Sequence, residues 1–110
     1  MQRVFDNLIR NAINYSFPDT EILIRMICDG DFIQIDFINH GNPIPPEKLS
    51  RIFEQFFRLD AARGSRTGGA GLGLAIAKEI VELHRGSITA SSEDEIIKFT
   101  VRLPSFVGKM

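Results

Sequence analysis

Residues 68–84 read GGAGLGLAIAKEIVELH, and the rest of the chain is organised around this stretch. Glycines at 68, 69, 71 and 73 lead directly into a pattern of apolar residues spaced three and four apart, which predicts a helix ending near Arg85 and Gly86. A glycine-rich loop before a helix N-terminus suits anion binding, because the first helical amides lack partners and glycine lets a phosphate approach. A flexible loop before an ordinary core helix is the alternative. The apolar residues are Leu72, Leu74, Ala75, Ile76, Ile80, Val81 and Leu83.

Two common phosphate-binding patterns are excluded by the same residues. No Lys-Ser or Lys-Thr pair follows the glycines, so the stretch is not a P-loop. Residues 69–73 are G-x-G-x-G rather than G-x-G-x-x-G, and no apolar strand precedes them, which excludes the dinucleotide fingerprint.

The composition indicates one soluble globular domain. The chain has 110 residues, 44% hydrophobic and 25% charged, with a formal net charge of −1, so it has no general attraction to nucleic acid or anionic membrane. Its single cysteine, Cys28, excludes an intrachain disulfide and is predicted to be a buried free thiol, because it lies in an apolar run. No apolar run approaches the roughly 18 residues that cross a bilayer, and the two distant histidines argue against a Cys/His zinc site.

A second helix is predicted near the N-terminus, over residues 3–16. Its polar side carries Asn7, Asn11 and Asn14 on one stripe, although asparagine costs roughly 0.5 kcal/mol relative to alanine inside a helix. An amide oxygen suits Mg²⁺ and an amide NH₂ can donate to a phosphate, so this stripe indicates a binding function; a solvated face is the alternative. The apolar face comprises Val4, Phe5, Leu8, Ile9, Ala12 and Ile13.

Two strands are predicted next, over residues 21–28 and 32–39, with a hairpin turn at Asp29-Gly30. In the second strand Ile33, Ile35 and Phe37 alternate with Gln34 and Asp36, which predicts one face covered by helices and one wet face.

The middle of the chain is predicted to be less regular. Residues 40–46 form a loop, a short helix runs from about residue 47 to 57, and residues 58–70 form a mobile lid because they have little to bury. Arginines in this lid suggest phosphate neutralisation, with a solvated loop as the alternative.

A final hairpin is predicted from residues 87–92 and 96–103, turning around Glu93-Asp94-Glu95. Two hairpins and two long helices predict an α+β fold with a largely antiparallel sheet and helices packed on one face.

Four segments in this order resemble the catalytic, ATP-binding domain of sensor histidine kinases, members of the GHKL superfamily. They correspond to the N box (residues 7–12), the G1 box (39–45), the F box (52–58) and the G2 box (68–76), and the match covers about residues 3–104. The subtype that these segments resemble is the vancomycin-resistance sensor kinase. The resemblance implies a Bergerat-type α/β sandwich with a mostly antiparallel, mixed sheet, and one ATP-binding domain over residues 1–110.

The resemblance also implies the site residues. Asn11 matches the Mg²⁺-binding asparagine, and Tyr15 a position that packs near the nucleotide, whereas Asn14 stands where many relatives carry a lysine. The implied catalytic residues are Asn7, Arg58 and Arg63. The implied nucleotide-binding residues are Asn7, Asn11, Tyr15, Asn39, Gly41, Ile44, Phe53, Gly69, Gly71, Leu72 and Gly73, and the implied cofactors are ATP and Mg²⁺.

Three departures bear on activity. Asn39 replaces the aspartate that reads adenine in most relatives; its amide can still accept from the adenine amino group, with a bond weaker by about 1 kcal/mol. Pro43 replaces a glycine and removes an amide donor. Asn7 stands where gyrase-type and Hsp90-type ATPases carry a glutamate base, which argues against fast hydrolysis.

The implied function is transfer of the γ-phosphoryl group to a histidine on a separate helical domain in a two-component system. The implied partners are the protein's own dimerisation and phosphoacceptor domain, a second copy in the full-length homodimer and, indirectly, a response regulator. The resemblance further implies a cytoplasmic domain of a parent anchored in the bacterial plasma membrane.

Two other functions are open alternatives. One is an anti-sigma serine kinase, although the presence of the F box argues against it. The other is a non-catalytic pseudokinase disabled at Asn39 and Pro43. The family's domain usually begins with a strand ahead of the N-box helix, so an uncovered sheet edge is expected here.

Overall fold

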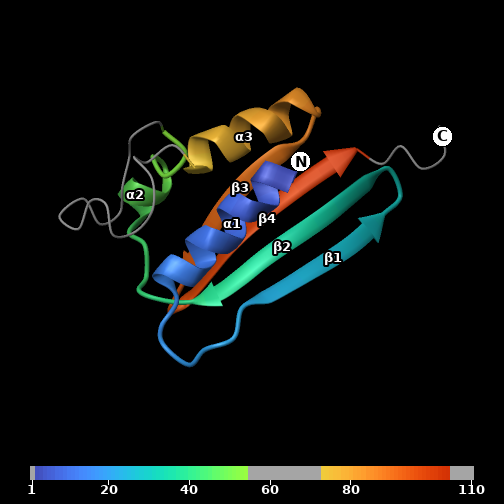
Figure 1. Cartoon of the computed structure of the whole chain (residues 1–110). Helices are drawn as coiled ribbons and strands as arrows, with labels where there is room; N and C mark the ends of the chain where they lie inside the picture. The colour runs from blue at the N-terminus through green and yellow to red at the C-terminus, as the bar shows by residue number, and fades with distance from the viewer. Residues whose placement is uncertain (1, 55–72, 105–110) are drawn as a thin grey trace.

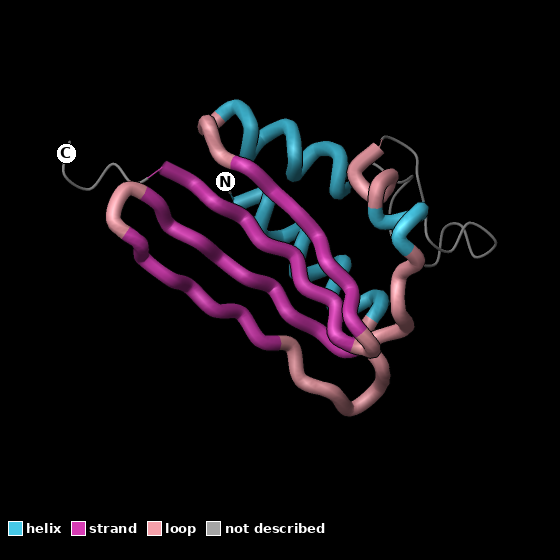
Figure 2. Tube along the Cα trace, turned by 180° about the vertical axis from the view of Figure 1, so that it is seen from behind, coloured by secondary structure: helices cyan, strands magenta, loops and turns pink. Residues whose placement is uncertain are grey.

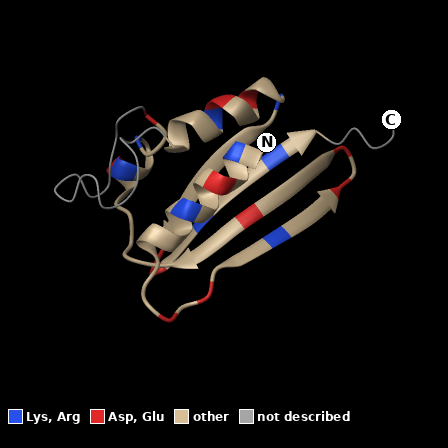
Figure 3. Cartoon of the chain, in the orientation of Figure 1, with Lys and Arg blue, Asp and Glu red and all other residues tan. Residues whose placement is uncertain are grey.

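The computed structural model describes residues 2–54 and 73–104 and shows helices on one face of a four-stranded sheet (Figures 1 and 2). No helix within these ranges is long and apolar enough to cross a membrane. Acidic and basic residues are interspersed along the helices and strands (Figure 3). The elements are α1 (Gln2–Tyr15), β1 (Leu23–Asp29), β2 (Phe32–His40), α2 (Pro46–Leu49), α3 (Gly73–Leu83), β3 (Ser87–Glu93) and β4 (Ile96–Pro104).

The sheet has the strand order β1-β2-β4-β3, and every ladder among the described residues is antiparallel. The two hairpins, β1–β2 and β3–β4, are those predicted from the turn residues. The central pairing joins β2 to β4 and sets Ile35 opposite Val101 and Asn39 opposite Ile97. The predicted α+β class is thereby confirmed, and the central pairing brings the two hairpins into one sheet.

The core lies between the sheet and the two long helices. Helix α1 buries Val4, Leu8 and Ala12, and α3 buries Ala77 and Val81. The predicted apolar faces were too wide at their C-terminal ends: Ile13 is 60% exposed and Leu83 is 76% exposed. Each helical residue turns about 100° from the one before, so Ile13 lies beside the buried stripe rather than on it. Leu83, two residues after Val81, faces away from the sheet.

The predicted buried thiol is wrong, because Cys28 is exposed. It lies on β1, which forms an edge of the described sheet beyond the cover of α1 (Figure 1). All seven residues of β1 are exposed, including the apolar Leu23, Ile24 and Met26. An apolar run therefore indicated a strand but not its place in the sheet.

Asp36 lies on the helix-free face, as predicted, but its side chain has no exposed surface. It accepts hydrogen bonds from Arg25 Nη2 at 2.9 Å, Thr100 Oγ1 at 2.9 Å and Gln34 Nε2 at 3.3 Å. Burial alone would raise the pKa of this carboxyl, but these bonds and the charge of Lys98 outweigh it and lower the pKa from 3.8. Arg25 of β1 and Thr100 of β4, together with Gln34 of β2 itself, thus surround the Asp36 carboxylate on the helix-free face.

Candidate functional site

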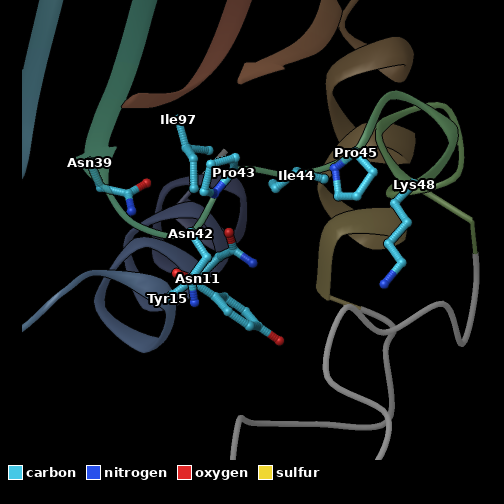
Figure 4. Close-up of a pocket in the computed structure, with 9 residues that line it drawn as sticks. All are labelled: Asn11, Tyr15, Asn39, Asn42, Pro43, Ile44, Pro45, Lys48 and Ile97. Atoms are coloured by element: carbon cyan, nitrogen blue, oxygen red, sulfur yellow. The ribbon is translucent and has the colours of Figure 1, made fainter. Parts of the chain in front are cut away.

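A pocket of about 250 Å³ opens where α1, the end of β2, the loop after β2 and α2 meet (Figure 4). These segments are far apart in the sequence and are brought together by the sheet and the helix layer. The lining residues are Asn11, Tyr15, Asn39, Asn42, Pro43, Ile44, Pro45, Lys48 and Ile97.

Helix α1 supplies Asn11 and Tyr15, which are one turn apart and share a face. Because Val4, Leu8 and Ala12 bury the neighbouring face against the core, these two side chains turn toward the pocket. Both are half-buried, whereas Asn14 of the predicted stripe is exposed and does not line the pocket. The structure therefore divides the stripe and assigns the pocket to Asn11.

Strand β2 supplies Asn39, which is only 2% exposed. Strand alternation places it on the helix-covered face with Ile35 and Phe37. Its Nδ2 is buried and has no hydrogen-bond partner among the described residues. A buried donor without a partner costs about 1–3 kcal/mol, so a bound molecule that offers an acceptor here would recover that free energy.

Two backbone amides of the loop after β2 donate hydrogen bonds that hold the loop in place. Gly41 N–H donates to Glu95 O at 3.0 Å, and Ile44 N–H donates to Ser92 Oγ at 2.9 Å. Pro43 lacks an amide donor, but these two anchoring bonds come from other residues, so the proline leaves them intact. Gly41, a predicted site residue, is buried and does not line the pocket; an added Cβ there would lie 2.3 Å from the carbonyl oxygen of Tyr15.

Three further predicted residues, Asn7, Gly73 and Phe53, lie outside the pocket lining. Asn7 Nδ2 donates to Gly73 O at 3.1 Å and so joins α1 to the first residue of α3. Phe53 packs edge-on against Phe99 with ring centroids 6.0 Å apart, as a core residue would. Lys78 Nζ lies 5.9 Å from the centroid of the Phe53 ring.

The remaining predicted residues lie outside the described part of the chain. This group comprises the lid (58–70), most of the G2 box, and the individual positions Arg58, Arg63, Gly69, Gly71 and Leu72.

Five lining residues were not among the predicted site residues. Asn42, Pro43 and Pro45 belong to the G1 box, so the motif itself could have indicated them. Lys48 reaches the pocket from α2 (Figure 4) and brings the positive charge that Asn14 cannot supply. Ile97 lies here only because β4 pairs with β2.

Helix α2 is shorter than the predicted helix. It spans Pro46–Leu49, and turns continue it to residue 54. Pro46 suits the first helical position, where no amide donor is required, and the amides of Lys48 and Leu49 both donate to Pro45 O at 2.9 and 3.0 Å. This turn fixes the start of the Lys48 side chain beside the pocket.

The pocket combines neutral amides, a phenol ring and one lysine. No group of three or more His, Cys, Asp or Glu side chains within residues 2–54 and 73–104 is placed to hold a metal ion. Asn11 offers the amide oxygen, a hard ligand of the kind Mg²⁺ accepts. Such a site can hold a flat heterocycle at its buried end and an anion–metal pair near its mouth.

Comparisons with known proteins agree with this description. The sequence model of the family described as histidine kinase-, DNA gyrase B-, and HSP90-like ATPases matches residues 1–106 of this chain. The chain is 54% identical over 102 residues to the sensor protein VanSC of Enterococcus gallinarum, covering 93% of this chain and 28% of that protein. It is 35% identical over 105 residues to the sensor histidine kinase CusS of Escherichia coli strain K12, and the match covers 96% of this chain and 22% of CusS. The chain thus spans about a quarter of the length of these relatives.

Solved structures share the same architecture. The catalytic domain of the histidine kinase ThkA superposes with a TM-score of 0.80 at 29% identity, covering 94% of this chain and 65% of that one. Full-length ShkA in complex with AMPPNP superposes with a TM-score of 0.78 at 25% identity, and the match covers 94% of this chain and 21% of ShkA.

Proposed function

This chain belongs to the histidine kinase-, DNA gyrase B-, and HSP90-like ATPase family, and we propose that it is the ATP-binding kinase domain of a sensor histidine kinase. The observation that carries the proposal is the meeting of Asn11, Tyr15 and Asn39 around one pocket with an unpartnered buried amide. Asn11 belongs to the N box, Tyr15 follows that box on α1, and Asn39 belongs to the G1 box on β2.

The purine is proposed to bind at the Asn39 end of the pocket. The Asn39 amide can accept from the 6-amino group of adenine and donate from Nδ2 to a ring nitrogen, which would satisfy the buried donor. Ile44 and Ile97 supply apolar contact for the base, and Tyr15 lies on the α1 side.

The phosphates are proposed to lie toward Asn11, whose amide oxygen would hold Mg²⁺. When bound, this ion would neutralise part of the triphosphate charge. Lys48 would add a positive charge from α2. Arg58 and Arg63 are proposed to neutralise the phosphates further, and Gly69, Gly71 and Leu72 to contribute loop amides.

Phosphoryl transfer to a protein is proposed in preference to hydrolysis of ATP. Asn7 occupies the position of a general base in related ATPases, but an amide cannot take a proton from water. Its NH₂ instead donates to Gly73 O and fixes the start of α3. The described residues therefore position the phosphates, and positioning with charge neutralisation supplies most of the catalysis in phosphoryl transfer.

The phosphate acceptor is proposed to be a histidine on a separate helical domain of the parent protein. Of the two histidines here, His40 ends β2, and His84 lies beyond α3 with Nδ1 2.8 Å from Ile80 O. Neither lies within a helix that could present it to another domain's active site. The parent is proposed to be a homodimer anchored in the bacterial plasma membrane. A response regulator is its proposed downstream partner, as the solved complex of ThkA with the response regulator TrrA illustrates for that kinase.

The comparisons do not favour an anti-sigma serine kinase, because the relatives named above are sensor kinases. A pseudokinase that has lost nucleotide binding is the outcome that a binding experiment can separate from the proposal.

Calorimetric titration with AMPPNP, with and without Mg²⁺, tests the site directly. Asn39→Ala is expected to weaken binding about tenfold or more, because one base contact is lost. Asn11→Ala is expected to abolish the gain in affinity from Mg²⁺. Gln2→Ala removes an exposed amide from the far end of the same helix. It should change neither the affinity for AMPPNP nor the gain in affinity from Mg²⁺. Absence of AMPPNP binding by the folded chain would support the pseudokinase instead.

A second experiment tests the position of the acceptor. Incubation of this chain alone with ³²P-labelled ATP is expected to leave no stable label on it. Labelled phosphohistidine on His40 or His84 would contradict the proposed separate acceptor.

A further inference from the structure

We propose that Asn39 allows this pocket to bind 6-oxopurine nucleoside triphosphates as well as ATP, an inference that rests on the proposed nucleotide-binding function. The chemical class is that of inosine and guanosine triphosphates, whose bases carry an oxygen where adenine carries an amino group. Asn39 is the residue that sets this specificity, because its side chain is the buried polar group of the pocket.

The position of Asn39 allows its side chain to contact the polar edge of the bound base. Among the described residues the buried polar side chains are Asp36 and Asn39, and only Asn39 lines the pocket. Pairing with Ile97 across the β2–β4 ladder fixes its backbone, and strand alternation directs its side chain into the helix-covered layer. The other polar lining groups come from α1, from α2 and from the loop, and are less buried.

Nothing among the described residues holds the amide in one orientation. Nδ2 has no hydrogen-bond partner, and its surroundings include the backbone of Gly41. A half-turn about the last side-chain bond exchanges the donor and acceptor ends of an asparagine. Either end can therefore face the bound base.

The two kinds of purine present opposite groups along the same edge. Adenine offers a 6-amino donor beside the N1 acceptor, whereas hypoxanthine and guanine offer a 6-oxo acceptor beside an N1–H donor. The amide can pair with the first edge through Oδ1 and Nδ2, and with the second edge after the half-turn. A carboxylate at residue 39 would present acceptors only. With one oxygen facing the 6-position, it would accept from the 6-amino group of adenine but repel a 6-oxo group, and it could pair with a 6-oxopurine only by shifting toward N1–H.

The test compares affinities for ATP, ITP and the triphosphate of unsubstituted purine riboside, all with Mg²⁺, by displacement of a fluorescent ATP analogue. ITP lacks the 2-amino group of GTP and so tests the edge without a change in size. For the unaltered chain we expect Kd values for ATP and ITP within about tenfold of each other, and weaker binding of the unsubstituted purine by about tenfold, since one hydrogen bond is lost. This series requires no variant and is independent of any change in folding.

Two variants sharpen the result. Asn39→Asp should raise the ITP-to-ATP ratio of Kd values by about tenfold or more. Asn14→Asp adds the same charge at an exposed residue of α1 that does not line the pocket, and it should leave the ratio unchanged.

The outcomes separate this inference from the function on which it rests. A preference of the unaltered chain for ATP over ITP of more than about a hundredfold, or an unchanged ratio in folded Asn39→Asp, would overturn the inference while leaving ATP binding intact. Failure of the folded chain to bind any of the three nucleotides would overturn the proposed function itself.

Discussion

Replacing Gly41 by alanine tests whether the end of α1 must lie directly on the loop that forms the pocket. An ideal Cβ at this position would lie 2.3 Å from the carbonyl oxygen of Tyr15 and 3.3 Å from Cδ1 of Ile97. Cβ atoms essentially never approach other atoms to less than 3.0 Å, so the Tyr15 backbone or the loop must shift. Backbone shifts forced by an added methyl group typically cost about 1–3 kcal/mol. The same shift would displace Tyr15, which lines the pocket.

Urea denaturation and AMPPNP titration measure the two consequences separately. Gly41→Ala is expected to lower the unfolding free energy by about 1–3 kcal/mol and to weaken AMPPNP binding at least about tenfold, because small displacements of positioning groups have large effects. Gly86→Ala is the matched control. Its Cβ would meet the carbonyl oxygen of Arg102 at 2.3 Å, in contact with residues that do not line the pocket.

The control variant should therefore lose stability but retain affinity in the folded state. Wild-type stability together with wild-type affinity in Gly41→Ala would refute the proposed contact between α1 and the loop. A loss of affinity in folded Gly86→Ala as large as that in Gly41→Ala would refute the link between this contact and binding.

Three further predictions follow from burial and charge. Leu8→Ala, at 1% exposure, should cost about 3 kcal/mol in urea denaturation, whereas Ile13→Ala, at 60% exposure, should cost under about 1 kcal/mol; equal losses would contradict the observed packing of α1. Because the pKa of Asp36 is lowered on folding, its ionised form stabilises the fold above the unfolded pKa of about 3.9, and this contribution is lost as the pH falls through the folded value. Asp36→Asn should abolish that part of the acid dependence, and an unchanged pH profile in denaturation experiments would count against it. Cys28 is exposed, so it should react with a thiol reagent in the native protein about as fast as in urea; strong protection would show that the β1 edge is covered.

Much of the fold could be predicted from local patterns. The periods of α1 and α3 are properties of neighbouring residues, and so are the two hairpin turns, which the structure places at Gly30-Asp31 and Asp94-Glu95, within one residue of the predicted positions. The resemblance carried by the sequence motifs likewise assigned Asn11, Tyr15 and Asn39 to one site, and these three residues line the pocket. Local chemistry was sufficient because each of these features depends on a few residues next to one another in the chain.

The tertiary structure decided which faces are covered and which distant groups meet. Alternation along a strand separates two faces but does not say whether the strand is central, so Cys28 was predicted to be buried, and the burial of Asp36 on the helix-free face was not foreseen. The order β1-β2-β4-β3 placed β1 at an edge and surrounded Asp36 with polar partners from both neighbouring strands. Lys48 and Ile97 joined the pocket through the docking of α2 and the pairing of β4 with β2. Periodicity acts over a few residues, whereas burial depends on contacts between segments far apart in the chain, and only the folded arrangement determines those contacts.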